Sequence, residues 1–235
     1  MKEEHLLKVV WLLLITLQLG LVQSVFAAED NPDPLEGINR ATHGFNEGID
    51  RLLVKPVAKG YKQGVPEVLQ QGVGHFFGNL EEIDNTANNL LQAKIKQALV
   101  SLGRLLINST VGLGGLLDPA TDIGLRAYPE DFGQTFRFWG IPPGPYLVMP
   151  FLGPSTVTDA LGRPLDSRLD PLRYYKPVAH RNILLGVELL DLRAELLSAE
   201  GIVFGDRYVF YRDAYLQRRH YLTNDGRVID EFDDF

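Results

Sequence analysis

The stretch that decides the fold runs from Arg137 to Pro154 and reads RFWGIPPGPYLVMPFLGP. It contains five prolines and three glycines, and most of its other residues are large and apolar. Proline lacks a backbone N–H and disfavours helical geometry in the residue before it, so neither a continuous helix nor a central strand is expected. The apolar side chains must then lie against protein or lipid along a fixed, irregular path. Two interpretations stay open: a rigid connector packed over a core, or the shaped wall of a surface or cavity.

On both sides of this stretch, the spacing of apolar residues predicts helices. The clearest covers 94–108. Its apolar face consists of Ile95, Ala98, Leu99, Leu102, Leu105 and Leu106, and its polar stripe of Gln97, Ser101, Arg104 and Asn108. Further helices are predicted over 182–198 and 206–222, and shorter ones over 34–50, 54–61, 66–77, 80–91, 131–138 and 156–161. No segment is convincing as a strand, so the sequence predicts an all-α fold.

The last predicted helix carries tyrosines at positions 208, 211 and 215 among several arginines. Such tyrosines can complete a core at its rim, with the ring buried and the hydroxyl in water. An amphipathic helix with aromatic and arginine side chains is also typical of a membrane interface. The pattern alone allows both interpretations.

The three glycines Gly112, Gly114 and Gly115 follow the helix predicted over 94–108. Glycine adopts backbone conformations that are closed to other residues, so we expect a flexible elbow at this point. A plain helix stop is the alternative, since glycine is common just after helix ends.

The two ends of the chain differ from its middle. Residues 1–27 are interpreted as a secretory signal, because an apolar run from Val9 to Val22 is followed by small residues at Val25 and Ala27. We therefore expect cleavage after Ala27. The range 28–225 is expected to form a single helical domain, and 226–235 an acidic C-terminal tail.

Composition excludes several classes of function. The formal net charge of −7 disfavours nucleic-acid binding, which requires clustered Lys and Arg. The chain has no cysteine, which excludes disulfides, thiolate metal ligands and a cysteine nucleophile. The histidines are scattered, and neither H-E-x-x-H nor G-x-S-x-G occurs. We therefore expect no catalytic residues, no metal site, no cofactor and no enzymatic activity.

Four blocks, in order along the chain, resemble the MlaA (VacJ) family of outer-membrane phospholipid-transport proteins from Gram-negative bacteria. The blocks are DPLEGINRATHGFNEGIDRLLVKPVAKGY (33–61), NLEEIDNTANNLLQ (79–92), RLLINSTVGLGGLLDPATDIGL (104–125) and FGQTFRFWGIPPGPYLVMPFLGPSTVTDALGR (132–163). The resemblance covers roughly 33–225. Many relatives carry a lipid-modified cysteine at the mature N-terminus, where this sequence has Ala27 and Ala28. The departure predicts that this protein is not a lipoprotein.

The resemblance implies a flat, doughnut-like helical body on the periplasmic side of the outer membrane, with an amphipathic channel. Phospholipid misplaced in the outer leaflet would pass through it to a periplasmic lipid carrier of the Mla system, and a trimeric outer-membrane porin is an expected partner. Irregular backbone at membrane depth lines protein or a wet cavity, so the candidate lining residues are Tyr146, Leu147 and Met149, together with the glycine elbow. The alternatives are a soluble periplasmic lipid-binding or scaffold protein and, third, a phospholipase, for which no nucleophile–histidine pair is found.

Overall fold

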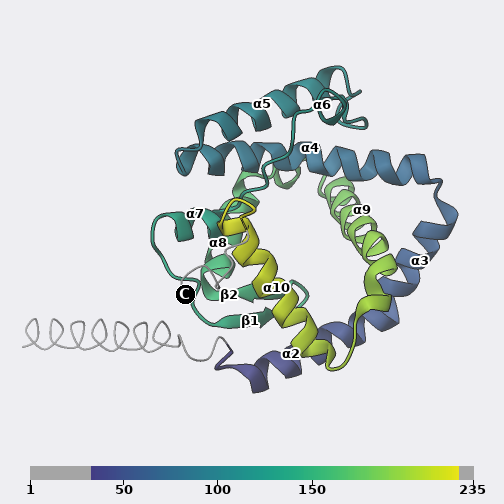
Figure 1. Ribbon diagram of the computed structural model, residues 1–235. Coiled ribbons are helices and arrows are strands. Elements are labelled where there is room, and N and C mark those ends of the chain that lie inside the picture. The colour runs from purple at the N-terminus through teal and green to yellow at the C-terminus, as the bar shows by residue number, and fades with distance from the viewer. Residues whose placement is uncertain (1–32, 228–235) are drawn as a thin grey trace, which may run out of the picture.

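The computed structural model describes residues 33–227, and the predicted signal segment and most of the acidic tail lie outside them. In the ribbon view, the helices form a ring (Figure 1). This arrangement confirms the all-α, doughnut-like fold that the resemblance implies. The helices are α2 (Glu36–Ile49), α3 (Lys55–Gly64), α4 (Glu67–Leu91), α5 (Ile95–Thr110), α6 (Pro119–Asp122), α7 (Phe132–Phe138), α8 (Val157–Leu169), α9 (Val178–Leu196) and α10 (Arg207–Thr223). Shorter helical turns are η1 (Asp50–Val54), η2 (Pro171–Tyr174) and η3 (Leu197–Ile202).

The first part of the ring is one nearly continuous helical path. The five-residue π-helical segment η1 joins α2 to α3 without a break, and Pro66 turns the chain into α4. The sequence predicted two helices over 66–77 and 80–91, but α4 is a single helix of 25 residues. That prediction is wrong because Gly78 weakens a helix by only about 1 kcal/mol and does not end it. Packing of α4 against α5 and α9 stabilises the long helix.

Side-chain caps fix where several of the later helices begin. Asp131, Thr156 and Asp206 accept hydrogen bonds from backbone N–H groups at the starts of α7, α8 and α10. The helix predicted over 156–161 ends too early, because α8 continues through Pro164 to Leu169.

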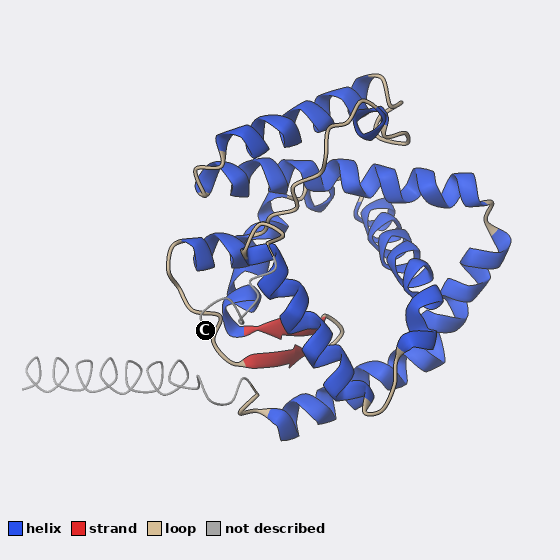
Figure 2. Cartoon of the chain, viewed as in Figure 1, coloured by secondary structure: helices blue, strands red, loops and turns tan. Residues whose placement is uncertain are grey.

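The decisive stretch contains a two-stranded antiparallel hairpin, the only strands among residues 33–227, formed by β1 (Tyr146–Met149) and β2 (Gly153–Thr156) (Figure 2). The prediction that no strand occurs is therefore wrong. Pro154 lies in β2 opposite Val148, and both strands of a two-stranded sheet are edge strands, where proline is tolerated. Phe151, in the left-handed conformation with φ of 63°, completes the turn.

Two asparagines of α2 hold the free edge of β1. The Nδ2 of Asn39 donates to the carbonyl of Tyr146 at 3.0 Å, and its Oδ1 accepts from the N–H of Val148 at 2.9 Å. Two helical turns later, Asn46 donates to the carbonyl of Met149 and accepts from the N–H of Phe151. These amides satisfy the strand edge as a third strand would, and so fix the hairpin against the ring.

The apolar core is small. Tyr146 and Val148 of β1 pack against Tyr208 of α10, with Val209, Tyr215 and Leu216 around them. Among the described residues, the other buried positions are more often polar than apolar. This composition is the reverse of an ordinary soluble domain.

Candidate functional site

Helix α5 has the predicted periodicity, but its faces are inverted. Ser101, Arg104 and Asn108 of the polar stripe are buried against α4 and the segment that follows α5. The apolar face points outward, and the exposed fraction is 63% for Leu99 and 57% for Leu106. A helix with this orientation is suited to an apolar surrounding medium.

The inward faces of α4 and α5 are joined by a buried ionic network. Arg104 forms ion pairs with Glu82 of α4 and with Asp118, and donates to the carbonyl of Leu125 at 2.6 Å. Burial opposes the ionisation of Asp118, but hydrogen bonds from Thr121, Asn108 and Arg104 lower its pKa to about 2. The network ties 118–125 to the two helices without an apolar core.

Large apolar side chains are exposed over much of the described surface. They occur on α2 and η1 (Ile38, Phe45, Leu52, Leu53), α4 (Val68, Leu69, Leu90, Leu91), α5 and its C-terminal turn (Ile95, Leu99, Leu106, Val111, Leu113), and α9 (Ile183, Leu189, Leu192, Leu196). We call these residues the apolar exterior. Extensive exposed apolar surface marks contact with a membrane or a partner. No helix within residues 33–227 is both long and apolar enough to cross a bilayer.

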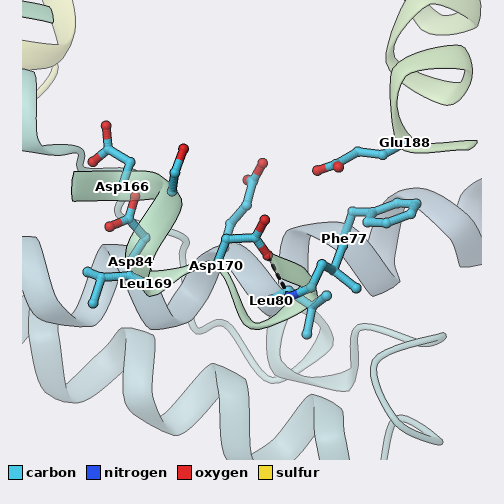
Figure 3. A pocket seen from close by; sticks show the side chains of 10 residues that line it. Phe77, Leu80, Asp84, Asp166, Leu169, Asp170 and Glu188 are labelled. Carbon is cyan, nitrogen blue, oxygen red and sulfur yellow. Dashed lines mark hydrogen bonds between the residues drawn. The ribbon is translucent and has the colours of Figure 1, made fainter. Parts of the chain in front are cut away.

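A cavity of about 210 Å³ lies between α4, α8 and α9. Its apolar lining consists of Phe77, Leu80, Leu169 and Leu172, and its polar lining of Glu81, Asp84, Asp166, Ser167, Asp170 and Glu188. In Figure 3 the carboxylate of Asp84 on α4 lies beside that of Asp166 on α8, Asp170 follows the end of α8, and Glu188 reaches toward them from α9. The cavity therefore has an amphipathic lining that contains no basic side chain.

Two of these carboxylates share a proton. The Oδ1 of Asp84 accepts from Asn88 at 2.9 Å, the Oδ1 of Asp166 accepts from the N–H of Phe132 at 2.8 Å, and a hydrogen bond joins the two acids. Burial, followed by the charges of Asp166 and Asp131, raises the pKa of Asp84 to about 8. Burial also raises the pKa of Asp166, to about 6, although the N–H of Phe132 opposes it. At neutral pH the pair thus holds a proton that the unfolded chain would release.

This proton predicts a pH-dependent stability. Because the pKa of Asp84 is raised in the folded protein, its contribution favours folding at low pH and is lost as the pH rises from about 4 towards about 8. Asp84→Asn should therefore become progressively more stable than the wild type across that window. Denaturation of both proteins from pH 5 to 8 measures this difference. The control is Asp122→Asn, which alters an exposed carboxylate of α6. Parallel curves for all three proteins would contradict the shared proton.

The three predicted lining residues of the hairpin lie on opposite faces of β1. Tyr146 is 1% exposed and packs with Tyr208 and Tyr215, with ring centroids 6.2 and 6.1 Å away. Leu147 and Met149 project to the other face and are partly buried. The structure thus separates Tyr146, which lies in the core, from the other two side chains.

The predicted glycine elbow is a compact turn at the end of α5. The N–H of Gly115 donates to the carbonyl of Asn108 at 2.8 Å, and that of Leu117 to the carbonyl of Gly112 at 3.0 Å. A Cβ on Gly112 would lie 2.4 Å from the Asn108 carbonyl oxygen, and one on Gly115 would lie 2.8 Å from the side chain of Asn79 in α4. Gly114 has open space around it, with φ of 75°. The elbow is remote in sequence from the hairpin, and its flexibility stays a prediction.

These contacts predict how much stability is lost when each of the three glycines is replaced by alanine. Gly112→Ala and Gly115→Ala should each lower the free energy of unfolding by about 2 kcal/mol or more, because each adds a clash. Gly114→Ala should cost only about 1 kcal/mol, the cost of left-handed geometry. Thermal denaturation of the three variants measures the order. Equal losses at all three positions would contradict the close approach to Asn108 and Asn79.

Sequence reasoning missed the cavity residues. None of the cavity's acidic residues, Glu81, Asp84, Asp166, Asp170 and Glu188, belongs to a recognisable motif. The spacing of Glu81 and Asp84 does place both on one face of α4. Their meeting with α8 and α9 depends on tertiary packing. Within the described residues, no group of three His, Asp or Glu side chains is arranged to hold a metal ion.

Comparisons with known proteins agree on one family. The sequence profile described as "MlaA lipoprotein" matches residues 31–222. The "Intermembrane phospholipid transport system lipoprotein MlaA" of Escherichia coli (strain K12) is 33% identical over 220 residues, which cover 91% of this chain and 87% of that protein. The protein of the same name from Haemophilus influenzae is 31% identical over 204 residues, covering 84% and 82% of the two chains.

A solved structure is also similar. It is described as "Structural basis for maintenance of bacterial outer membrane lipid asymmetry". It superimposes with a TM-score of 0.73 at 32% sequence identity, and the match covers 82% of this chain and 99% of that one.

Proposed function

Because the chain belongs to the MlaA lipoprotein family, we propose that it carries phospholipid through the interior of its helical ring. The protein is a component of intermembrane phospholipid transport and acts in maintaining the lipid asymmetry of the outer membrane. The proposal that phospholipid passes through the ring rests on the reversed polarity of the fold, with apolar side chains outside and polar ones inside.

The reversed polarity suits a body that lies within one leaflet. The apolar exterior would contact acyl chains, and the buried network of Glu82, Arg104 and Asp118 would remain away from them. A phospholipid in transit needs a polar wall for its headgroup and an apolar route for its tails. The cavity between α4, α8 and α9 offers both kinds of lining.

Family membership corrects one sequence-based prediction. The absence of cysteine led us to predict a protein that is not a lipoprotein. The relatives from Escherichia coli and Haemophilus influenzae are both named lipoproteins, as is the family itself. The prediction of an unlipidated protein is therefore wrong.

The proposal extends to partners and chemistry. The chain would pass phospholipid to a periplasmic lipid carrier of the Mla system and would associate with a trimeric porin. No covalent bond is made or broken in this scheme, so the protein acts as a conduit and not as an enzyme. A soluble periplasmic scaffold would gain nothing from so extensive an apolar exterior.

Substitution of Leu147 tests whether the lipid route passes the hairpin. We propose that Leu147 and Met149 border the route, whereas Tyr146 supports β1 from the core side. Leu147→Asp would place a charge in a poorly hydrated setting, at a cost of several kcal/mol if it stays ionised. In a deletion strain, this variant should fold and localise correctly but fail to remove phospholipid from the cell surface. Leu147→Met is the matched control and should restore transport and detergent resistance. Loss of the whole protein in Leu147→Asp would assign the residue to packing instead.

A further inference from the structure

Arg137 is the one partly buried Lys or Arg side chain within residues 33–227 that has neither a hydrogen bond nor an ion pair. Every other partly buried or buried lysine or arginine there is joined to an acceptor, as Arg104, Arg193 and Arg219 illustrate. A guanidinium carries five N–H donors and is never deprotonated in proteins. Because the guanidinium is partly shielded from water, an acceptor from outside the chain would stabilise it.

The carboxylates around Gly133 of α7, Asp131 and Asp159, are already engaged. Asp131 accepts from both terminal nitrogens of Arg219 and from the N–H of Gln134. Asp159 accepts from Arg219 through Oδ1 and from the hydroxyl of Tyr215 through Oδ2. Burial lowers the pKa of Arg137, the charge of Asp159 opposes that effect, and the charge of Arg219 adds to it. Asp159 therefore acts on Arg137 through its charge alone, and no hydrogen bond joins the two side chains.

The position of Arg137 on α7 defines the site. It lies one helical turn after Gly133, on the same face, because residues four apart are neighbours along a helix. A Cβ on Gly133 would lie 2.3 Å from Oδ1 of Asp159 and 2.7 Å from Nη2 of Arg219, so this face packs against α8 and α10. The Nε of Arg219 is itself buried without an acceptor. The cluster thus holds two arginine groups with unused donors, the whole guanidinium of Arg137 and the Nε of Arg219.

The last residue of α7 and the residues just after it carry exposed apolar side chains. Phe138, Trp139 and Ile141 are exposed by 55%, 52% and 42%. The guanidinium therefore lies at the boundary between a polar cluster and an apolar surface. A phospholipid presents the matching pair of groups, a phosphodiester and acyl chains, and the planar fork of arginine suits phosphate oxygens.

We propose that Arg137 binds a phosphate oxyanion at the junction of α7, α8 and α10. The identification of a lipid as its source rests on the proposed function; inorganic phosphate is the other source with the same chemistry. In the lipid case, the exposed apolar residues that follow Arg137 contact the acyl chains.

The test uses the full chain in detergent and dihexanoylphosphatidylcholine as the probe, with retained lipid counted by native mass spectrometry. Arg137→Gln should weaken retention roughly tenfold or more, since a hydrogen-bonded charge is lost. Arg126→Gln, at an exposed arginine in the loop before α7, should retain lipid as the wild type does. The melting temperature of Arg137→Gln should be unchanged, because its side chain has no partner in the protein. Should that variant fail to fold, Arg137→Lys keeps the charge without the fork and should weaken retention less.

A second arm separates the two sources. If inorganic phosphate binds in an Arg137-dependent manner and the lipid does not, the site takes free phosphate; if the lipid binds and phosphate fails to compete, it takes the headgroup. Equal retention by Arg137→Gln and Arg126→Gln, with no Arg137-dependent phosphate binding, overturns the site. That failure would leave the transport proposal intact, because Leu147→Asp tests the route independently.

Discussion

Replacing Arg104 with alanine should lower the free energy of unfolding by about 3–5 kcal/mol. Glu82 is 2% exposed, and its charge would be left buried without its partner. Asp118 would lose an ion pair, and Leu125 would lose the donor to its carbonyl. Because a typical domain is stable by only about 5–15 kcal/mol, this single change would remove a large part of the total.

Chemical denaturation of the full chain in detergent measures the effect of Arg104→Ala. Arg126→Ala, at an exposed arginine, is the control and should have little effect. The double variant Glu82→Leu with Arg104→Met should recover part of the lost stability, since it removes both charges together. A loss below about 1 kcal/mol for Arg104→Ala would contradict a polar interior held by buried ion pairs.

The second large effect is on membrane binding by the apolar exterior. Leu99→Asp combined with Leu106→Asp should reduce binding of the protein to liposomes by about a hundredfold or more. Each change removes about 1.5–3 kcal/mol of apolar burial and places a charge against hydrocarbon, and each 1.4 kcal/mol is tenfold in affinity. Both side chains are exposed in the fold, so the melting temperature should be unchanged.

Liposome flotation measures this binding. Lys96→Asp changes a charge at an exposed position of the same helix, and it should bind liposomes nearly as well as the wild type. Unchanged flotation of the double variant would mean that the outward face of α5 does not meet lipid. Parallel losses of flotation and melting temperature would instead assign the two leucines to packing.

Helix α5 illustrates what the sequence determines and what it leaves open. The spacing of its apolar residues predicted a helix over 94–108, and α5 ends two residues later, at Thr110. The prediction succeeds because this spacing follows from backbone geometry alone. The same pattern is silent on which face points inward, since that choice depends on the surrounding medium. In water Leu99 and Leu106 would be buried, whereas here Ser101 and Arg104 are.

The hairpin and the cavity could not be derived in the same way. The prolines around 142–154 disfavour strands locally. The hairpin forms nevertheless because Asn39 and Asn46, about a hundred residues away in the sequence, hydrogen-bond to the backbone of β1. The cavity likewise assembles carboxylates from α4, α8 and α9, each unremarkable on its own helix. Long-range pairings of this kind leave no local periodicity. The resemblance to the family was nevertheless detectable, because it rests on four separate segments of the sequence taken together.

The most direct test of transport through the ring interior places a photo-crosslinking residue at Leu169, which lines the cavity, and another at Leu106 on the apolar exterior. Both proteins would be crosslinked in outer membranes, and the captured lipid identified by mass spectrometry. Lipid of the surrounding leaflet should reach Leu106 in any case, so capture there is the positive control. Phospholipid captured at Leu169 is the result we predict. Capture at Leu106 with only protein captured at Leu169 would contradict a lipid route through the interior.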